Sequence, residues 1–506
     1  MHKLEIKLKQ HTPLIHFQHD QDGATLRASE VKPKLDKFII NKLKETGEYD
    51  KGVKEGWIKC KNGKEWLDYK MRMEDTEDNV VFYETNKKRL YTDSNRLNDK
   101  QNNKDIVYVT VGQQLDEYNS KTQSLVIKEG GKEYIAKRRE SDSKVVYALS
   151  CYPCFFANID ADITDMNEYR KISWAQNTFK MVLLVKDENL YSILNKPETI
   201  SSFFLNHNFG TRQSKGFGSF YVDKNDPLYL SPETKYSFEI SANRNEKGFE
   251  ELFKQIELFS RSIRAGINVK DRNQKTLFYF KSLAFMYCKD ELKAEWDKKA
   301  VKSYFYLEDT ERRRSDKRYQ RSLTAQREKY QNDEEHDILF FDSNIGYDIR
   351  DMLGFSTNES WLTYKDTIKK EVAIIKEGTC TYPRSQDSLP IDRMKSPLLF
   401  KPICDEANVY KVLLVFQDDE VGMQVFKNQQ KICFTSKKEK EVIEGRVRPK
   451  RFMLPLPKRF SMEDYFYYIF NKLHFNIATH VNTDFHGRPE YETLSKIFSQ
   501  LSNNLK

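Results

Sequence analysis

The sequence predicts an α+β protein made of more than one folded unit. Three observations predict this class. The chain opens with an alternating apolar strand followed by an amphipathic helix, a second strand and helix follow at residues 181–204, and the second strand has an echo after residue 408. Since domains average about 150 residues, a chain of 506 residues has room for two or three such units.

The opening strand and helix are predicted from hydrophobic spacing. Leu4, Ile6 and Leu8 alternate with charged residues, which is the period-two pattern of a strand with one buried face. Thr12-Pro13 then interrupts the strand, because proline cannot donate to a ladder. Ser29 is the expected cap of a helix whose apolar positions recur at helical spacing. These positions are Val31, Leu35, Phe38, Ile39 and Leu43.

The composition changes from about residue 41 to residue 150. This stretch is rich in Lys, Glu, Asp and Asn and holds only sparse strand patterns, at Ile106–Val111 and Val145–Leu149. We therefore expect a charged, solvated insertion. An insertion of this kind keeps open a further interpretation, an interaction scaffold without RNA contacts of its own.

A second ordered block follows the insertion. Met181–Val185 is an apolar strand, and Ile200, Phe203 and Phe204 share one face of a helix that is expected to end at Gly210. Residues 177–188 match residues 408–419 without gaps at Asn, Lys, Leu and Asp, in the pairs 177/408, 180/411, 183/414 and 187/418. Two interpretations stay open, two ordinary buried strands or a duplicated α+β unit.

Charge and composition exclude some classes of protein. Aromatic residues make up 13% of the chain, so a disordered chain does not fit. The net charge of +9 on 506 residues is too small to identify a partner, and local clusters are more informative. Residues 312–330 carry eight basic and two acidic residues, and residues 437–451 carry seven and three. Such runs are either solvated faces or, with Tyr319 and Tyr330 in the first cluster, phosphate-tracking surfaces.

Cysteine spacing and hydropathy bear on the compartment and on metals. No apolar run reaches the eighteen residues of a membrane helix and no signal region is present, so we expect a soluble, cytoplasmic protein with no membrane partner. Cys151-Tyr-Pro-Cys154 has the spacing of half a zinc site or of a redox pair, but no second Cys-x-x-Cys or nearby His pair completes a zinc site. We expect buried thiols and no cofactor or metal, with a redox pair as an alternative. Asp160, Asp162 and Asp165 form either an exposed strand or Mg²⁺ ligands.

The segment Phe209–Phe220 holds three glycines, two cations and three phenylalanines in twelve residues. Gly210, Gly216 and Gly218 are expected to present backbone N–H groups to a phosphate, with charge added by Arg212 and Lys215. The spacing is neither a P-loop nor a dinucleotide fingerprint, which disfavours a nucleotide cofactor. A glycine-bulged hairpin and a site for the backbone of RNA or DNA remain as alternatives.

Three histidines near the start of the chain are candidate catalytic residues. His11, His16 and His19 form either an ordinary polar loop or the general acid and base of an RNA-cleaving enzyme. Neither Gly-x-Ser-x-Gly nor His-Glu-x-x-His occurs, so hydrolases of those kinds are excluded. We expect a protein that is not an enzyme.

Several of these motifs resemble one known family. Thr12-Pro13-Leu14, Leu26-Arg27-Ala28-Ser29 and the glycine-rich segment resemble the CRISPR-associated RAMP superfamily. Arg393–Pro402, leading into the strand at Val412–Phe416, resembles the second half of the tandem-RAMP subunit numbered first in type III-B Cmr effectors. The resemblance covers roughly residues 1–40, 150–222 and 393–417.

The resemblance implies two tandem ferredoxin-like, RRM-like modules. The first would span residues 1–240 with the insertion at about 41–150, and the second residues 241–506 with helical and basic insertions. It also implies a non-catalytic capping and backbone subunit of an antiviral ribonucleoprotein, at the 3′ end of the guide RNA. The implied partners are the CRISPR guide RNA, single-stranded target RNA and other Cmr subunits. A metal-independent RAMP-type endoribonuclease that processes CRISPR RNA is the alternative.

A protein that holds a guide while base pairing supplies specificity needs phosphate contacts and aromatic wedges. The residues expected to contact RNA are Arg27, Lys32, Gly210, Arg212, Lys215, Gly216, Phe217, Gly218, Arg312, Arg313 and Arg314.

Overall fold

The computed structural model divides into two compact units. The first unit is Met1–Glu257 with Phe400–Val415, and the second is Leu258–Leu399 with Phe416–Lys506. The predicted division at residue 240 stays a prediction. The structure describes residues 1–14, 26–74, 80–84, 87–92, 108–109, 118–119, 124–129, 132–137, 145–150, 161–162, 171–175, 178–271, 275–313, 339–340, 346–361, 364, 366–376, 379–381, 393–417, 431–443, 446–457 and 460–505.

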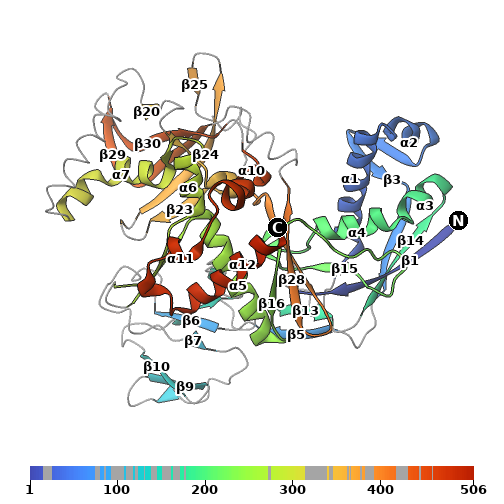
Figure 1. Ribbon diagram of the computed structural model, residues 1–506, viewed down its shortest axis with the longest axis horizontal. Coiled ribbons are helices and arrows are strands. Elements are labelled where there is room, and N and C mark those ends of the chain that lie inside the picture. The colour runs from blue at the N-terminus through green and yellow to red at the C-terminus, as the bar shows by residue number, and fades with distance from the viewer. Residues whose placement is uncertain are drawn as a thin grey trace. The chain divides into compact units, whose positions relative to one another are not determined.

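A four-stranded antiparallel sheet organises the first unit (Figure 1). Its order is β15 (Phe220–Val222), β1 (His2–Gln10), β14 (Phe179–Val185) and β4 (Tyr69–Glu74). Leu4, Ile6 and Leu8 of β1 are buried and the residues between them are mostly exposed, which confirms the predicted strand. The apolar strand predicted at Met181–Val185 is also confirmed, as part of β14.

Helices pack on the face of this sheet that carries Leu4, Ile6 and Leu8. They are α1 (Ala28–Thr46), α3 (Glu188–Leu194) and α4 (Pro197–Asn206), and all three contribute side chains to one core. The predicted apolar face of α1 is confirmed, but Ser29 is not its cap. The cap position is Arg27, two residues earlier, and its side chain makes no capping bond. Likewise α4 ends at Asn206, four residues before the predicted Gly210.

The predicted insertion begins too early in the chain. Residues 41–46 complete α1, and α2 (Tyr49–Glu55), β2 (Ile58–Lys61) and β3 (Lys64–Leu67) lead directly into β4 of the main sheet. Trp57, Leu67 and Tyr69 are buried in the core, so these residues are part of the unit although their composition is charged. Beyond residue 74 the described strands are β5 (Val80–Glu84), β6 (Lys87–Thr92), β7 (Tyr108–Val109), β8 (Tyr118–Asn119), β9 (Ser124–Glu129), β10 (Lys132–Lys137), β11 (Val145–Ser150), β12 (Ala161–Asp162) and β13 (Lys171–Ala175).

A second, three-stranded sheet has the order β16 (Ser237–Ser241), β28 (Val409–Phe416) and β27 (Leu398–Cys404). The helix α5 (Glu246–Arg264) follows β16, as α1 follows β1. The two matching sequence segments, residues 177–188 and 408–419, contain β14 and β28. Each of these strands pairs antiparallel with the strand that precedes the first helix, and each has one further neighbour. The repeated pattern therefore occupies the same position in both sheets.

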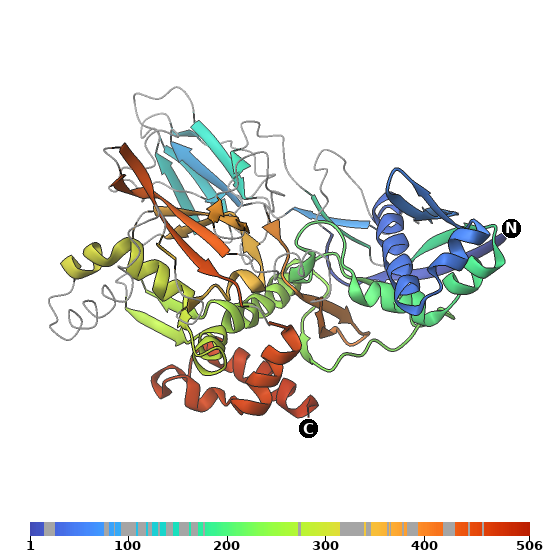
Figure 2. The same cartoon turned by 90° about the horizontal axis from the view of Figure 1, so that it is seen from above.

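The second unit contains a further sheet, with the order β20 (Leu339–Phe340), β30 (Arg446–Pro455), β29 (Lys431–Ile443), β24 (Asp366–Lys376) and β23 (Asn358–Trp361). The strand β25 (Thr379–Thr381) pairs with β24. Figure 2 shows β29 and β30 side by side as long strands. The other helices and strands described in this unit are β17 (Ile267–Lys270), β18 (Thr276–Phe280), α6 (Leu283–Asp290), β19 (Glu295–Trp296), α7 (Asp297–Arg313), β21 (Gly346–Tyr347), β22 (Phe355–Ser356), β26 (Arg393–Met394), α10 (Met462–Tyr467), α11 (Ile477–His480) and α12 (Pro489–Asn504).

The second unit buries a network of charged side chains. Arg350 donates to Glu359 at 2.7 Å and pairs with Asp297, while Lys370 pairs with Asp351 at 2.6 Å. Burial alone would raise the pKa of Glu359, but Arg350 and Lys370 outweigh it and lower the pKa to about 2. Because buried charges are stable only when paired, this network acts as a scaffold.

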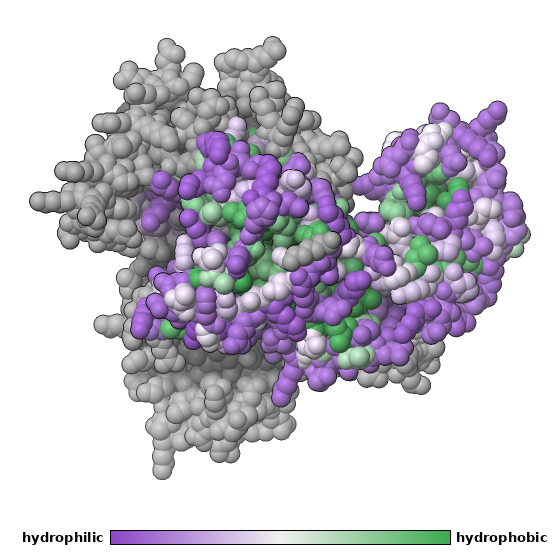
Figure 3. Space-filling model, in the orientation of Figure 1, coloured by the Kyte–Doolittle hydropathy of each residue, from purple (hydrophilic) through white to green (hydrophobic). Residues whose placement is uncertain are grey.

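The α+β class is confirmed, as a mixed arrangement of helices and mainly antiparallel sheets. Where the structure describes the chain, no helix is both long and apolar enough to cross a membrane. Over α1–α4 the visible surface is largely hydrophilic, with small apolar patches (Figure 3).

Candidate nucleic-acid interface

The glycine-rich segment forms a closed turn between α4 and β15. At its base the N–H of Phe209 donates to the carbonyl of Gly218 at 2.9 Å, and the N–H of Gly218 donates to Pro13 at 2.8 Å. Thr12 lies beneath the turn, where its hydroxyl donates to Gly216 at 2.7 Å and accepts from the N–H of Ser219 at 2.9 Å. We call residues 209–219 the glycine turn. It is tied to the end of β1 by main-chain and side-chain bonds.

The conformation of the turn requires glycine at Gly218. Gly218 has a φ of 63°, and a Cβ added there would lie 2.0 Å from the carbonyl oxygen of Phe209. Gly216, at a φ of 90°, has more room, since its nearest neighbour would be Pro402 at 3.1 Å. The glycines therefore allow a close approach of main chain to main chain.

The prediction that the three glycine N–H groups are presented to a phosphate is wrong. The N–H of Gly210 donates to Glu30 at 2.7 Å, that of Gly216 donates to Gln213 at 3.3 Å, and that of Gly218 donates to Pro13. Each amide has a single hydrogen, so none of the three is available to a phosphate in this fold. The bulged-turn alternative describes the glycines better, and RNA contact by this segment stays a prediction that depends on its cations.

Arg212 and Lys215 lie at the outer part of the glycine turn and are partly exposed. Arg212 occupies the left-handed region at a φ of 57°, and its guanidinium lies 5.9 Å from the ring of Phe217. Phe217 is fully buried, with its ring stacked on Phe253 at 3.7 Å. In this position Phe217 anchors the turn in the core and has no exposed face on which a base could stack.

The start of α1 and the glycine turn form one site. Glu30 accepts from Gly210, and Lys34 donates to the carbonyl of Asn208 at 3.3 Å and to Gln213 at 3.2 Å. Arg27, immediately before α1, therefore lies one helical turn from the contact with Gly210. Two motifs separated by about 180 residues meet, which the sequence pattern alone does not show.

Lys32 has a different environment. Its ammonium pairs with Asp36 at 2.7 Å, donates to Leu67 at 3.0 Å and lies over the ring of Tyr69. Burial raises the pKa of Asp36, although Lys32 opposes this shift. Lys32 therefore ties α1 to the strands β3 and β4, and its predicted RNA contact stays a prediction.

Lys401 supports the glycine turn from below, and sequence reasoning missed it. Its ammonium is fully buried and donates to His207 at 2.8 Å, to Asn208 at 3.1 Å and to Phe220 at 2.7 Å. Burial and the nearby Lys34 lower the pKa of Lys401 well below its ordinary value. The signal was a single lysine inside the apolar strand Leu398–Cys404, because a lysine is seldom fully buried without a dedicated set of acceptors.

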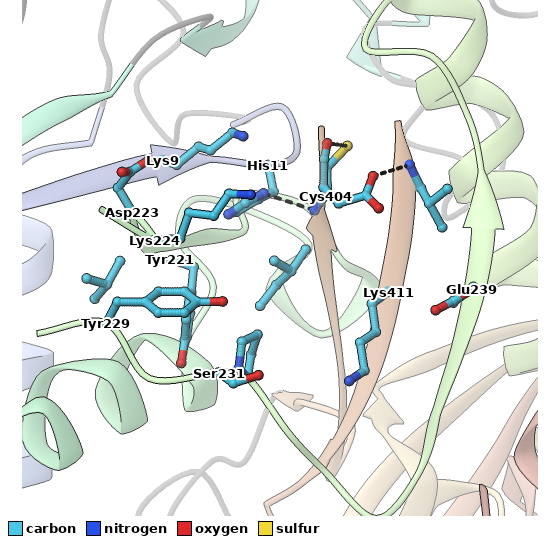
Figure 4. Close-up of a pocket in the computed structure, with 15 residues that line it drawn as sticks. Lys9, His11, Tyr221, Asp223, Lys224, Tyr229, Ser231, Glu239, Cys404 and Lys411 are labelled. Carbon is cyan, nitrogen blue, oxygen red and sulfur yellow. Dashed lines mark hydrogen bonds between the residues drawn. The ribbon is translucent and has the colours of Figure 1, made fainter. Parts of the chain in front are cut away.

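His11 is a buried structural histidine in this fold. It is 4% exposed, and its Nδ1 accepts the N–H of Cys404 at 3.0 Å (Figure 4). Burial lowers the pKa of His11 well below its ordinary value, with additional lowering by Lys9, Lys401 and Arg244. His16 and His19 lie outside the described residues.

We expect His11→Asn to flatten the loss of stability in acid. Below an ordinary histidine pKa of about 6.5 the unfolded chain takes up a proton that native His11 does not, so stability falls as the pH falls. This contributes a slope approaching 1.4 kcal/mol per pH unit. Asparagine keeps an acceptor for Cys404 but does not titrate. Chemical denaturation from pH 7.5 to pH 5 measures the difference, and parallel pH profiles for the two proteins would contradict this origin of the slope.

The remaining residues predicted to contact RNA belong to the second unit or lie outside the described part. Arg312 and Arg313 are the last two residues of α7 in the second unit. Arg314, Cys151, Cys154, Asp160 and Asp165 lie outside the described residues. The cluster at 437–451 falls on β29 and β30. Within the described part of the chain, no group of three His, Cys, Asp or Glu residues is placed to hold a metal ion.

Comparison with known proteins gives two family matches. The Cmr1 N-terminal domain matches residues 1–130 and 95–267, and the Cmr1 C-terminal domain matches residues 279–497. No curated protein matches the chain. A chain in a cryo-EM structure of type III-B Cmr-beta, bound to cognate target RNA and AMPPnP in the presence of ssDNA, is similar at 12% identity and a TM-score of 0.29. The likeness covers 83% of this chain and 96% of the other.

The two family matches define a CRISPR-associated protein of the RAMP superfamily, the class that the glycine-rich segment and the helix start predicted. Within this class the chain belongs to the Cmr1 family. The predicted resemblance is confirmed at this level.

Proposed function

We propose that this protein is a non-catalytic RNA-binding subunit of a cytoplasmic type III-B Cmr ribonucleoprotein in antiviral defence. It contacts the 3′ end of the guide RNA and the target RNA paired beside it, and it assembles with the other Cmr subunits. Membership of the Cmr1 family supports the assembly. The observation that carries the RNA contact is the pair Arg212 and Lys215, partly exposed on a turn that the core holds rigid.

Phosphate contacts of this kind fix the position of a nucleic acid without reading its sequence. In an RNA-guided complex base pairing reads the sequence, so a subunit that holds the guide needs cations on a rigid support. Arg27 adds a third cation at the start of α1, beside the same turn. The enzymatic alternative loses support, because His11 is buried and bonded to the main chain.

We further propose that the chain contains two tandem ferredoxin-like modules. The chain order β1, α1, β4, β14, α3 with α4, and β15 is a βαββαβ order, with extra elements between α1 and β4. The position of β14 and β28 in their sheets supports a second module that begins at β16.

We expect the double variant Arg212→Ala with Lys215→Ala to bind single-stranded RNA more weakly and with a smaller salt dependence. Each lost phosphate contact should reduce the slope of log K against log salt by about 0.7, so the pair should reduce it by about 1.4. Fluorescence anisotropy with a labelled RNA across a salt series measures both quantities. Lys51→Ala with Lys54→Ala, two exposed lysines on α2, is a matched control for charge.

An unchanged salt slope in the Arg212 and Lys215 variant, with an unchanged melting temperature, would remove the turn from the RNA interface. The assembly itself is tested by tagging the protein in its native host and sequencing the RNA that copurifies. Short RNAs of discrete lengths with a shared repeat-derived 5′ end are expected together with Cmr proteins. A random sample of transcripts would overturn the proposed function.

A further inference from the structure

The sheet of the first unit has a second face, opposite the helices, that is rich in cations. On β1 this face carries Lys3, Glu5, Lys7 and Lys9, because the alternate residues are in the core. Strand pairing places Lys180 of β14 opposite Lys7, and on β4 Lys70, Arg72 and Glu74 point to the same side. We call these eight residues the open face. It carries six cations and two carboxylates.

The two carboxylates do not neutralise the open face. Glu5 pairs with Lys3 and, at 3.4 Å, with Lys180, while Glu74 pairs with Arg72. Among the described residues, Lys7, Lys9 and Lys70 form no ion pair, although Lys9 is close enough to Glu406 to lower the pKa of that carboxyl. Lys7 and Lys180 lie directly opposite each other on paired strands, an arrangement of like charges that destabilises a sheet. An external polyanion would relieve this repulsion.

A cavity opens next to the open face at Lys9. Its volume is about 260 Å³. Lys9 pairs in register with Tyr221 of β15, and both line the cavity together with Tyr229 and Ile403. A cavity of about 150 Å³ holds benzene, so this one has room for a nucleic-acid base.

The polar groups of the cavity carry both signs of charge and lie beside an aromatic ring. Asp223 and Asp405 are occupied in turns, where they accept from the N–H groups of Asn225 and Val409. Lys224 also lines the cavity, and it is paired at 2.7 Å with Glu406, which does not. Lys9 and Lys411 reach into the cavity from separate strands, and the ring of Tyr229 lies along its wall (Figure 4). Glu239 also lines the cavity and lies directly opposite Lys411 on the paired strands β16 and β28. Lys9 is close enough to Glu406 to lower the pKa of that carboxyl, so the charges of both lysines are partly balanced.

We infer that the open face and this cavity form a second binding site for single-stranded nucleic acid. Phosphates lie along Lys7 and Lys9 of β1, which are two residues and therefore about 6.8 Å apart at 3.4 Å per residue. One base enters the cavity beside Tyr229. A base-sized cavity next to a cationic track distinguishes this site from a surface for an acidic protein. The inference extends the proposed RNA-binding role to a different surface of the first unit, and its test is separate from that of the glycine turn.

The first test removes the three unpaired cations in the full-length protein. Lys7→Gln with Lys9→Gln and Lys70→Gln should reduce the salt slope for a labelled single-stranded RNA by about 2, from three contacts of about 0.7 each. Lys42→Gln with Lys51→Gln and Lys54→Gln makes the same change of charge on exposed positions of α1 and α2 and should leave the slope nearly unchanged. Equal slopes for the two triple variants would overturn the inference.

The second test addresses the base. Tyr229→Leu should weaken RNA binding about tenfold without a change in salt slope, since stacking is lost and charge is kept. The same variant should bind an abasic RNA of equal length as well as the wild type does. Independently of folding, 5-iodouridine RNA bound to the wild-type protein should crosslink to the peptide that contains Tyr229. A crosslink confined to the glycine turn would overturn the cavity assignment.

The outcomes separate the two proposals. If the Arg212 and Lys215 variant loses RNA while the open-face variant does not, the further inference fails and the proposed function stands. If only the open-face variant loses RNA, the site is the open face and the turn is structural. If the open-face variant loses binding to polyglutamate but not to RNA, the open face is a surface for an acidic protein and the inference is overturned.

Discussion

Replacing Gly218 by alanine is expected to unfold the first unit of the protein, with a loss of about 4 kcal/mol or more in the free energy of unfolding. A Cβ at this position would lie 2.0 Å from the carbonyl oxygen of Phe209 and 2.8 Å from its carbon. Both neighbours are main-chain atoms, so no rotamer change relieves the overlap. The hydrogen bond from Phe209 to Gly218 and the bond from Gly218 to Pro13 would be lost with the turn.

The matched control is Gly63→Ala. Gly63 has a similar φ of 73°, but nothing lies within 4 Å of an added Cβ. This variant reports only the cost of alanine in the left-handed region, about 1 to 2 kcal/mol. Thermal and denaturant unfolding of the full-length chain compare the two variants. Equal losses would show that the close approach at Gly218 is absent in solution.

Replacing Lys401 by methionine is expected to cost about 3 kcal/mol. The variant leaves three buried acceptors without a donor, on His207, Asn208 and Phe220, and each unsatisfied group costs about 1 to 3 kcal/mol. Removing a charge from the core offsets part of this loss. Lys61→Met, at an exposed position at the end of β2, changes the same side chain without such acceptors and should be nearly neutral.

The stability of the Lys401 variant should also differ in its response to pH. Because the pKa of Lys401 is lowered in the native protein, the unfolded chain binds more protons than the native chain between this lowered pKa and the ordinary lysine pKa of about 10.4. The wild-type protein therefore gains stability from this group as the pH rises through that window, and the variant does not. A stability difference that is constant with pH would contradict the buried ammonium.

Local sequence patterns predicted the elements whose spacing is regular. The alternation of Leu4, Ile6 and Leu8, the apolar face of α1 and the buried positions of α4 follow directly from period and hydropathy. The echo of β14 in β28 was visible for the same reason. Composition was a poorer guide, because residues 41–74 are strongly charged and still contribute Trp57 and Leu67 to the core.

The sequence predicted where the candidate site lies in the chain, but it did not predict which contacts its residues make. The glycine pattern identified the turn, but the pattern does not state which acceptors the glycine N–H groups meet, and these acceptors are Glu30, Gln213 and Pro13. The buried state of Phe217 depends on Phe253, 36 residues later. The open face was missed although Lys3, Lys7 and Lys9 alternate along β1, because the neighbouring cations come from strands that only the fold brings together.

The order of synthesis limits when the glycine turn can be complete. Its main chain is made by residue 219, but Lys401 and the rest of Phe400–Val415 belong to the same unit and are made about 180 residues later. At 5 to 20 residues per second this interval lasts roughly 10 to 40 s. During that time His207, Asn208 and Phe220 have no lysine to bond, so the nascent chain must emerge almost to residue 415 before the turn has its native support.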